Sequence, residues 1–380
     1  MEINNNILEQ VSLSGKTVLI RLGVNVPVKD GKVVNDFRIR KVLPTLEYLV
    51  EQGAKVVAIS HIENKEGSSL RPVADYLNEI LPVRFVEDWD VNNVKGKVGH
   101  ISEDEVVLLE NLRFHSAEKE NDNEFARVLS SLADLYVNEA FSVSHRMHAS
   151  IVGVPKFIPG YEGFLFRSER ENLSKAFDPL HPFLFVLGGA KFSTKIPLIE
   201  KFVNRAEKIF VGGALAHSFF DAQGMSVGQS LLEVVENEII ERLLKSNSVI
   251  LPTDVVVYDS ENDKHRVTKP SEVRDNEMIV DAGPETVKIL SAEVTKSKFV
   301  VWNGPLGNYE KGFDGATVDL AKALSSSQAY SLVGGGDTVA AVSAIGSEDS
   351  FSFLSSGGGA MLDFLSSETL PGIEALKGSQ

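Results

Sequence analysis

Four short apolar stretches in the second half of the chain run straight into clusters of glycine, and no other feature constrains the fold more. A strand that ends in glycine and turns into a helix leaves backbone N–H groups at a positive helix end, where phosphates bind. One such turn alone is equally consistent with a tight connection that holds no ligand. The four together predict a parallel sheet whose carboxyl edge holds a polyphosphate. They are Phe183–Leu187 before Gly188-Gly189, Ile209–Val211 before Gly212-Gly213, Ser331–Val333 before Gly334 to Gly336, and Phe353–Ser356 before Gly357 to Gly359, each followed by a helical pattern.

Missing motifs and the charge balance exclude several classes of protein. The sequence has no G-x-x-x-x-G-K-[ST] and no clean G-x-G-x-x-G, so it lacks both the P-loop and the dinucleotide fingerprint. It has no cysteine, which excludes disulfides and thiol catalysis. A net charge of −15 argues against nucleic acid or an anionic membrane as partner. A small phosphorylated ligand needs only a local cluster of positive groups.

The length of 380 residues is too great for one ordinary core and predicts two domains. We expect a first domain at 1–162, a joining helix at 163–178, a second domain at 179–368 and a tail at 369–380 that returns toward the first. No apolar run reaches the roughly 18 residues of a membrane helix, and the N-terminus does not resemble a signal peptide. We therefore expect a cytoplasmic protein that acts as a monomer.

Strand patterns alternate with helix patterns through the first half, which predicts a parallel sheet covered on both faces. An irregular, exposed section is expected between Leu251 and Met278, where charged residues gather. The predicted strands of the first half are Lys16–Val26, Lys55–His61, Val83–Val86, Glu105–Leu109 and Leu135–Phe141, and the predicted helices cover 39–50, Pro72–Leu81 and Asn123–Ala133.

Basic and polar residues gather at the predicted strand ends of the first half. Because these ends share one edge of a parallel sheet, they predict a pocket for a small anion. Two alternatives stay open: Arg113 pairs with Glu110 or Glu139, or His145 and His148 bind a metal, although no carboxylate–histidine signature surrounds them. A polyphosphate site and a small-anion site together suggest phosphoryl transfer between two closing domains. The residues are Arg21, Asn25, Arg38, His61, Arg113, His145, Arg146 and His148.

Long collinear motifs over nearly the whole chain resemble those of phosphoglycerate kinases. The resemblance implies two similar α/β domains, each with a mainly parallel, six-stranded type of sheet flanked by helices, joined by a long helix and hinge. The motifs include Ser60-His61, Glu110 to Phe114, Tyr136 to Phe141 with His145-Arg146-x-His148, Leu187 to Lys191 with Lys195, Asp281 to Pro284 with Thr286, Trp302 to Pro305, Gly334 to Thr338 and Ser356 to Ala360.

The resemblance also implies substrates and roles. The substrates are 3-phosphoglycerate or 1,3-bisphosphoglycerate on the first domain and ADP or ATP with Mg²⁺ on the second. Glycerate binding is implied for Asn25, Arg38, His61, Arg113 and Arg146. Charge neutralisation on the transferred group is implied for Arg38 and Lys191, and backbone N–H donation for Gly335 and Gly358. Nucleotide binding is implied for Gly189, Lys195, Gly213, Asn303, Glu310, Gly336, Asp337 and Thr338, with Asp337 as the magnesium ligand.

Three departures from the family pattern lie in the glycerate domain. Gly23 replaces the aspartate that accepts from the glycerate hydroxyl in the family. The family motif Ser-His-Leu-Gly-Arg-Pro reads Ser60-His61-Ile62-Glu63-Asn64-Lys65, so Asn64 replaces an arginine and Glu63 adds a negative charge. The motif Asp-Ala-Phe-Gly-Thr-Ala-His-Arg is altered to Glu139 through Arg146. Lys65 restores a positive charge near the missing arginine, but not its bidentate fork.

Two further hypotheses stay open, of which only the first follows from these departures. The first is a paralogue that binds Mg-nucleotide but has another acceptor or a binding or regulatory role. The second is a nicotinamide dehydrogenase on a similar sheet, which would need a fingerprint glycine loop and a ribose-binding acid that the sequence does not show.

Overall fold

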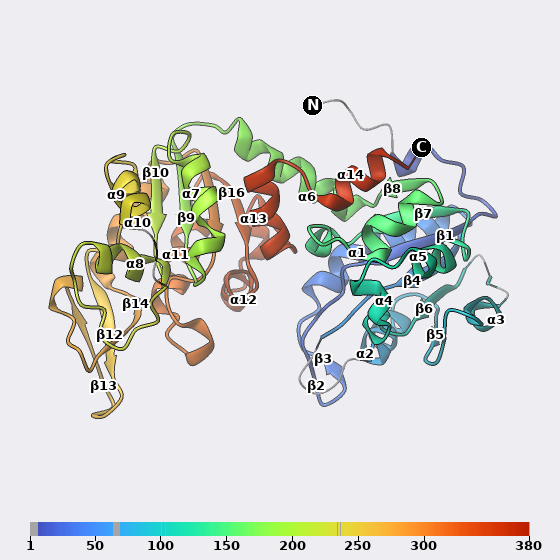
Figure 1. Ribbon diagram of the computed structural model, residues 1–380, viewed down its shortest axis with the longest axis horizontal. Coiled ribbons are helices and arrows are strands. Elements are labelled where there is room, and N and C mark those ends of the chain that lie inside the picture. Colours follow the sequence, from blue (N-terminus) through green and yellow to red (C-terminus); the bar gives the residue numbers. More distant parts are fainter. Residues whose placement is uncertain are drawn as a thin grey trace. The chain divides into compact units, whose positions relative to one another are not determined.

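The computed structural model describes residues 7–63, 69–99, 101–102, 104–233, 235 and 237–379 (Figure 1). Asn64 and Lys65 lie outside the described residues. The chain divides into two compact units, one of Met1–Glu171 with Ser367–Gln380 and one of Asn172–Ser366. The boundary at Glu171 falls inside helix α6 (Phe164–Ser174), which a short 3₁₀ turn at Lys175–Phe177 extends. The joining and hinge role of this segment stays a prediction.

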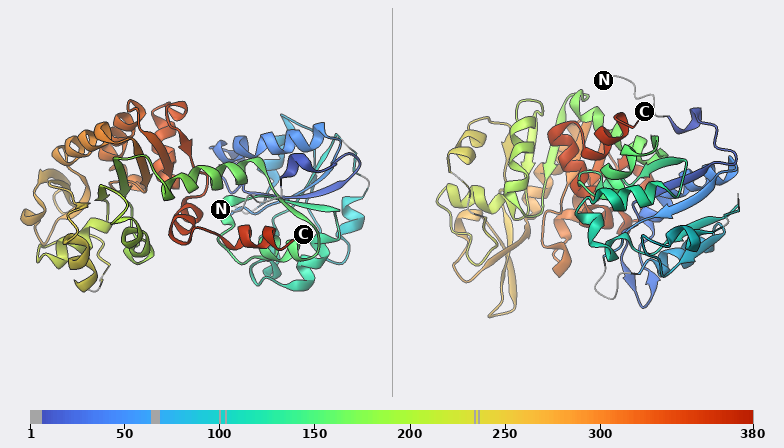
Figure 2. Two further views of the ribbon diagram at one scale, coloured as in Figure 1. Left: turned by 90° about the horizontal axis from the view of Figure 1, so that it is seen from above. Right: turned by 45° about the vertical axis from the view of Figure 1, so that its right-hand side comes forward.

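The first unit is built on a six-stranded sheet of order β5-β6-β4-β1-β7-β8, in which every neighbouring pair is parallel. Helices lie on both faces of the sheet (Figure 2). Its strands are β1 Thr17–Leu22, β4 Lys55–Ile59, β5 Val83–Val86, β6 Val106–Leu109, β7 Leu135–Glu139 and β8 Gly160–Glu162, with a small hairpin of β2 Val28–Lys29 and β3 Lys32–Val33. Its helices are α1 Phe37–Glu51, α2 Arg71–Asn78, α3 Val94–Val98, α4 Ser116–Lys119, α5 Asn123–Ser130 and α14 Pro371–Lys377.

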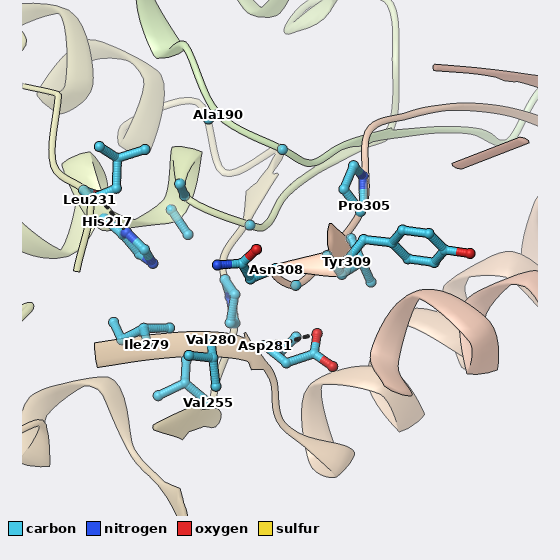
Figure 3. A pocket seen from close by; sticks show the side chains of 18 of the residues that line it. Ala190, His217, Leu231, Val255, Ile279, Val280, Asp281, Pro305, Asn308 and Tyr309 are labelled. Carbon is cyan, nitrogen blue, oxygen red and sulfur yellow. Dashed lines mark hydrogen bonds between the residues drawn. The ribbon is translucent and has the colours of Figure 1, made fainter. Parts of the chain in front are cut away.

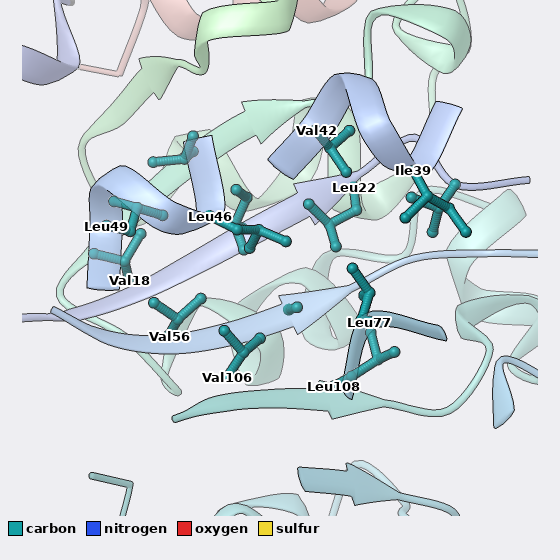
Figure 4. Packing of buried hydrophobic residues seen from close by; sticks show 14 of the residues in the cluster. Val18, Leu22, Ile39, Val42, Leu46, Leu49, Val56, Leu77, Val106 and Leu108 are labelled. Atoms are coloured by element: carbon teal, nitrogen blue, oxygen red, sulfur yellow. The ribbon is translucent and has the colours of Figure 1, made fainter. Parts of the chain in front are cut away.

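The core of this unit explains why the apolar runs form strands. Both faces of a parallel sheet are buried, so β1, β4 and β6 are almost continuously apolar. On one face, Val18, Val56 and Val106 pack against Leu46 and Leu49 of α1, as Figure 4 shows. The predicted strand Lys16–Val26 is too long, because the chain leaves the sheet after Leu22. The segment beyond it, residues 23–27, lies at the carboxyl edge.

The second unit repeats the architecture with a parallel six-stranded sheet of order β11-β10-β9-β15-β16-β17. The two sheets confirm the predicted fold class. The strands of this sheet are β9 Phe183–Leu187, β10 Lys208–Val211, β11 Val249–Ile250, β15 Phe299–Asn303, β16 Tyr330–Gly334 and β17 Phe353–Leu354. The helices are α7 Ile196–Phe202, α8 Leu215–Ala222, α9 Asn237–Leu244, α10 Pro284–Lys296, α11 Gly315–Ser325, α12 Gly336–Ala344 and α13 Gly358–Ser367.

The section between Leu251 and Met278 is not irregular, and that prediction is wrong. It forms most of an antiparallel three-stranded sheet of β12 Val255–Asp259, β13 Lys264–Thr268 and β14 Met278–Ala282. Val255 and Val257 point into a small core, whereas the β12–β13 turn is exposed. The charged residues of this turn concealed the strand pattern in the sequence. They belong to the turn itself, where the Asp259 carboxylate accepts from the N–H groups of Glu261 and Asn262 at 3.0 and 3.3 Å.

Within the described ranges, no helix is both long and apolar enough to cross a membrane. The C-terminal helix α14 belongs to the first unit, where Gly372 donates its N–H to the Ser144 carbonyl at 2.9 Å. This contact places the end of the chain beside the loop that follows β7.

Candidate active site

Two helices of the second unit begin next to each other. Gly335 precedes α12 with φ 105°, in a region that favours glycine. A Cβ on Gly358, at the start of α13, would lie only 3.0 Å from the Gly335 Cα. The first N–H groups of a helix have no partner inside it, so two positive helix ends meet at this point. The arrangement suits phosphate oxygens.

The end of β15 is joined to α12 beside these helix starts. Thr338 is fully buried, and its hydroxyl accepts from the Gly304 N–H at 3.0 Å. The Asn303 side chain is buried as well, and its amide lies 3.8 Å from the Met361 Sδ. These contacts hold the strand end against the helix. Thr338 therefore acts at least as a structural link.

In the first two glycine clusters, the expectation of bare N–H groups is wrong for Gly188, Gly189 and Gly212. Gly188 and Gly189 donate to the carbonyls of Asn303 and Pro305 at 2.9 and 2.7 Å, and Gly212 donates to Leu187 at 2.8 Å. Helix α7 begins only at Ile196, after a 3₁₀ turn. These glycines are needed for close backbone packing: a Cβ on Gly213 would lie 2.6 Å from the Gly189 nitrogen.

A cavity of about 240 Å³ opens between the main sheet and the small antiparallel sheet of this unit (Figure 3). Its walls are largely apolar, with Val255, Ile279, Val280 and Leu306 among them. Four predicted nucleotide-site residues line it, namely Gly189, Gly213, Glu310 and Asp337. An apolar cavity with a few polar groups at its rim is typical of a small-molecule site.

His217 on α8 is a buried polar residue of this cavity that the sequence analysis missed. Its Nδ1 lies 2.7 Å from the Leu231 carbonyl oxygen and must donate to it. Burial lowers the pKa of His217, so the ring is neutral with the proton on Nδ1. Its Nε2 is then an acceptor, and in Figure 3 the ring lies in the cavity. The only signal in the sequence was a histidine just after a Gly-Gly turn.

Two lysines follow the Gly188-Gly189 turn. Lys195 is 6% exposed, and its Nζ donates to the carbonyls of Gly188 and Ala190 at 2.6 and 3.2 Å. Burial, together with the charge of Lys191, lowers the pKa of Lys195 to about 8. Lys191 is exposed and has φ 63°. A bound phosphate would raise the pKa of Lys195 again and keep its ammonium group protonated.

Asp337 and Glu310 place two carboxylates at the cavity. Burial, and then the charge of Glu310, raise the pKa of Asp337, so a cation held between the two carboxylates would favour their ionised form. Across the parts of the chain that the structure describes, no three His, Cys, Asp or Glu residues are grouped to hold a metal. Mg²⁺ is usually bound by one or two carboxylates with phosphates and water. The two side chains fit that mode.

Four arginines surround His61 in the first unit. Burial, followed by the charges of Arg21, Arg113, Arg146 and Arg38, lowers the pKa of His61 well below its ordinary value. Arg21 Nη2 lies 2.8 Å from His61 Nδ1 and donates to it. Neutral His61 therefore carries its proton on Nε2, as a donor within a strongly basic cluster. Such a cluster attracts a small anion.

Arg21 is part of the framework of this cluster. Its side chain is 1% exposed, and Nε donates to the Ser150 hydroxyl at 3.0 Å. Ser150 in turn donates to the buried Glu118 carboxylate at 2.6 Å. The buried positive charge is thus balanced through Ser150. Through its Nη2 contact with His61 Nδ1, the buried Arg21 fixes the orientation of the His61 ring.

The predicted partners of Arg113 are wrong. Its Nη1 pairs with the carboxylate of Glu63. Glu110 instead accepts from the N–H groups of Leu70 and Asn111 at 2.7 and 2.8 Å. Glu139 accepts from Leu165 and Phe166 at 3.0 and 3.1 Å, at the start of α6.

The remaining predicted glycerate residues lie on the first turn of α1 and on loops at the carboxyl edge of the sheet. Arg38 donates from Nη1 to the Asn25 carbonyl at 2.7 Å. Arg146 is exposed, with Nε 3.4 Å from His145 Nε2. Burial and the charges of Arg113 and Arg146 lower the pKa of His148 to about 4, so this histidine is neutral.

Gly23 faces the loop after β7. A Cβ on Gly23 would lie 3.0 Å from the Ser142 hydroxyl and 3.3 Å from the Ala140 Cα. The resemblance places a glycine at position 142 and an aspartate at position 23. The two positions have therefore exchanged their small residue, and Ser142 occupies the space beside Gly23.

One unit has glycine-bounded helix starts beside a cavity, and the other has an arginine cluster. Together these features are typical of two-domain α/β phosphotransferases. The model of the family described as phosphoglycerate kinase matches residues 8–368. The chain is 40% identical over 387 residues to the phosphoglycerate kinase of Pseudothermotoga lettingae, covering 97% of this chain and 98% of that protein. It is 39% identical over 390 residues to that of Dictyoglomus turgidum, with coverage of 97% and 98%.

Solved structures of phosphoglycerate kinases share the fold of this chain. The phosphoglycerate kinase from Pyrococcus horikoshii superposes with a TM-score of 0.87 at 31% identity, covering 98% of each chain. That from Coxiella burnetii gives 0.81 at 38% identity, covering 97% of this chain and 98% of the other. The chain belongs to the phosphoglycerate kinase family. It has phosphoglycerate kinase function, as a phosphotransferase with a carboxyl group as acceptor, and the dehydrogenase alternative is wrong.

Proposed function

We propose that the chain transfers a phosphoryl group reversibly between 1,3-bisphosphoglycerate and Mg-ADP, with the glycerate substrate on the first unit and the nucleotide on the second. The observation that carries the acceptor site is the set of four arginine charges around a neutral, buried His61. A carboxylate and a phosphate together need this much positive charge. The acceptor is already ionised, so no general base is required.

The first unit would bind the glycerate through its basic groups. His61 Nε2–H, Arg113 and Arg146 donate to the phosphate and carboxylate oxygens. Arg38 is held by the Asn25 carbonyl at 2.7 Å and helps to neutralise the charge on the transferred group. These contacts position the substrate and lower its charge, which is most of what phosphoryl transfer asks of a protein.

The second unit would bind the nucleotide at the cavity and the two helix starts. Gly335, Gly336 and Gly358 present backbone N–H groups to the phosphates, with Lys191 and Lys195 as counter-charges. Asn303 and Thr338 support this edge from inside the fold. Asp337, with Glu310 nearby, would hold Mg²⁺, which would neutralise negative charge on the nucleotide phosphates.

A pair of variants tests the division of labour. Arg38→Ala should abolish most 3-phosphoglycerate turnover and leave calorimetric binding of Mg-ADP unchanged. Asp337→Asn should weaken Mg-ADP binding at least tenfold and leave binding of 3-phosphoglycerate unchanged. If Arg38→Ala weakens ADP binding, or Asp337→Asn weakens glycerate binding instead, the assignment of the two sites is wrong.

A further inference from the structure

We propose that Glu63 is an internal counter-anion in the acceptor pocket: its carboxylate occupies one side of Arg113 and thereby lowers the affinity of the pocket for highly charged phosphorylated ligands. The inference rests on the proposed function of this pocket. It assigns to Glu63 a role in setting acceptor affinity and charge preference. In the family pattern the same position is a glycine, which has no side chain to do this.

Glu63 is attached to three elements at the carboxyl edge of the first sheet. Its N–H donates to the Asn25 side-chain oxygen at 3.0 Å, next to β1. Its carboxylate pairs with Arg113, which follows β6 in the 3₁₀ turn Leu112–Phe114, and lies 3.4 Å from Lys119 Nζ on α4. Two of these partners, Asn25 and Arg113, are predicted substrate residues. Glu63 thus lies within the pocket rim.

The carboxylate is ionised in this position. Burial raises the pKa of Glu63, but hydrogen bonding and charge from Arg113 and Lys119 outweigh it and lower the pKa overall. The Glu63 side chain is 52% exposed, whereas that of Arg113 is only 6% exposed. A nearly buried guanidinium therefore meets a carboxylate at the pocket surface.

The opposite edge of Arg113 points to a ligand. Its Nε and Nη2 are buried and have no hydrogen-bond partner among the described residues. These two donors form one side of the guanidinium fork, which matches two oxygens of a phosphate or carboxylate. Buried donors normally have an acceptor, so a bound oxyanion is the natural partner. Glu63 holds the third donor site, Nη1, at the same time.

A bound oxyanion and Glu63 would then share one guanidinium. The two negative charges repel each other, and the repulsion grows with the charge of the ligand. Because Glu63 is half exposed, solvent screens much of it, and removal of the charge should improve affinity by roughly three- to tenfold. The gain should be larger for a phosphate dianion than for a carboxylate monoanion.

The test compares Glu63→Gln with wild type by calorimetry, using inorganic sulfate, 3-phosphoglycerate and glycerate as probes, and by the KM for 3-phosphoglycerate. Glu51→Gln is the matched control, because Glu51 is an exposed residue at the far end of α1 and its loss changes the net charge equally. Glu63→Gln should tighten the binding of sulfate and of 3-phosphoglycerate three- to tenfold and the binding of glycerate less, and it should lower the KM for 3-phosphoglycerate. Glu51→Gln should change none of these.

Arg113→Met provides the second arm. In that background the Glu63→Gln gain in sulfate affinity should be clearly smaller than in wild type, because the oxyanion and the carboxylate no longer share the Arg113 guanidinium. Unchanged or weaker sulfate binding in Glu63→Gln, or an equal gain in the Arg113→Met background, overturns the inference. Failure of the proposed function looks different: wild type would then neither bind nor turn over 3-phosphoglycerate, whatever the variants do with sulfate.

Discussion

Replacing Gly23 by the aspartate of the family pattern is expected to destabilise the first unit, not to restore a substrate contact. The φ of Gly23 lies outside the left-handed region, so the backbone itself accepts a side chain. The obstacle is Ser142, whose hydroxyl would lie 3.0 Å from the new Cβ. Real Cβ contacts are rarely this close, and the Ala140 backbone at 3.3 Å blocks retreat on that side.

The cost follows from overpacking. Forcing extra atoms into a filled site typically costs about 1–3 kcal/mol of unfolding free energy. Ser142→Gly alone should cost about 0.5–1 kcal/mol through added backbone freedom. In the double variant the clash is gone, so the two changes should be coupled by roughly 1–2 kcal/mol in the stabilising direction. The single Gly23→Asp variant should also raise the KM for 3-phosphoglycerate, and the double variant should lower it again.

Urea denaturation of wild type and the three variants measures the coupling, and hydrogen exchange of β1 and β7 peptides shows that the change is in the first unit. The KM for 3-phosphoglycerate is measured in parallel. A Gly23→Asp variant as stable as wild type, or single effects that simply add, would refute the idea that Ser142 fills the space of the missing aspartate.

Three further predictions concern buried titratable groups. Burial raises the pKa of Glu139 from 4.5 to about 7, so this group's contribution to stability is full below pH 4.5 and is lost as pH rises to 7. The thermal midpoint of Glu139→Gln should therefore fall less between pH 4.5 and pH 7 than that of wild type. An equal pH slope of the midpoint in both proteins would contradict this prediction. Lys195 has a pKa of about 8, so binding of ADP at pH 8 should take up protons, detected by calorimetry in buffers of different ionisation enthalpy. Lys195→Met should abolish the proton uptake and weaken ADP binding at least tenfold. His217 Nε2 can accept a hydrogen bond from the adenine amino group but not from the guanine carbonyl. His217→Phe should therefore reduce the ratio of the GDP dissociation constant to the ADP dissociation constant. An unchanged ratio would exclude a role of His217 in base selection.

The sequence predicted the strand and helix rhythm well because burial on both faces leaves nearly continuous apolar runs, as in β9 and β15. Strand ends were less predictable. Residues after Leu22 are still apolar, but they leave the sheet to reach the pocket rim. The strands at 251–278 were missed because the charged Asp259 turn dominated the pattern.

The candidate site was predictable in its residue types and not in its pairings. Arginines at strand ends indicated an anion pocket, because parallel strands share an edge. The Arg113 partner was missed because Glu63 lies 50 positions away and meets it only when the loops after β4 and β6 converge. Likewise, the use of the Gly188 and Gly189 N–H groups by Asn303 and Pro305 depends on a strand more than 100 residues later.

The most direct test of the account is a coupled assay of the purified protein with 3-phosphoglycerate and Mg-ATP, beside calorimetric binding of Mg-ADP. The account predicts turnover on the order of 10 per second or more, within the usual range of enzymes, despite Gly23 and Asn64. Firm binding of Mg-ADP without turnover would contradict it, because the nucleotide site would then be intact and the acceptor would not be 3-phosphoglycerate.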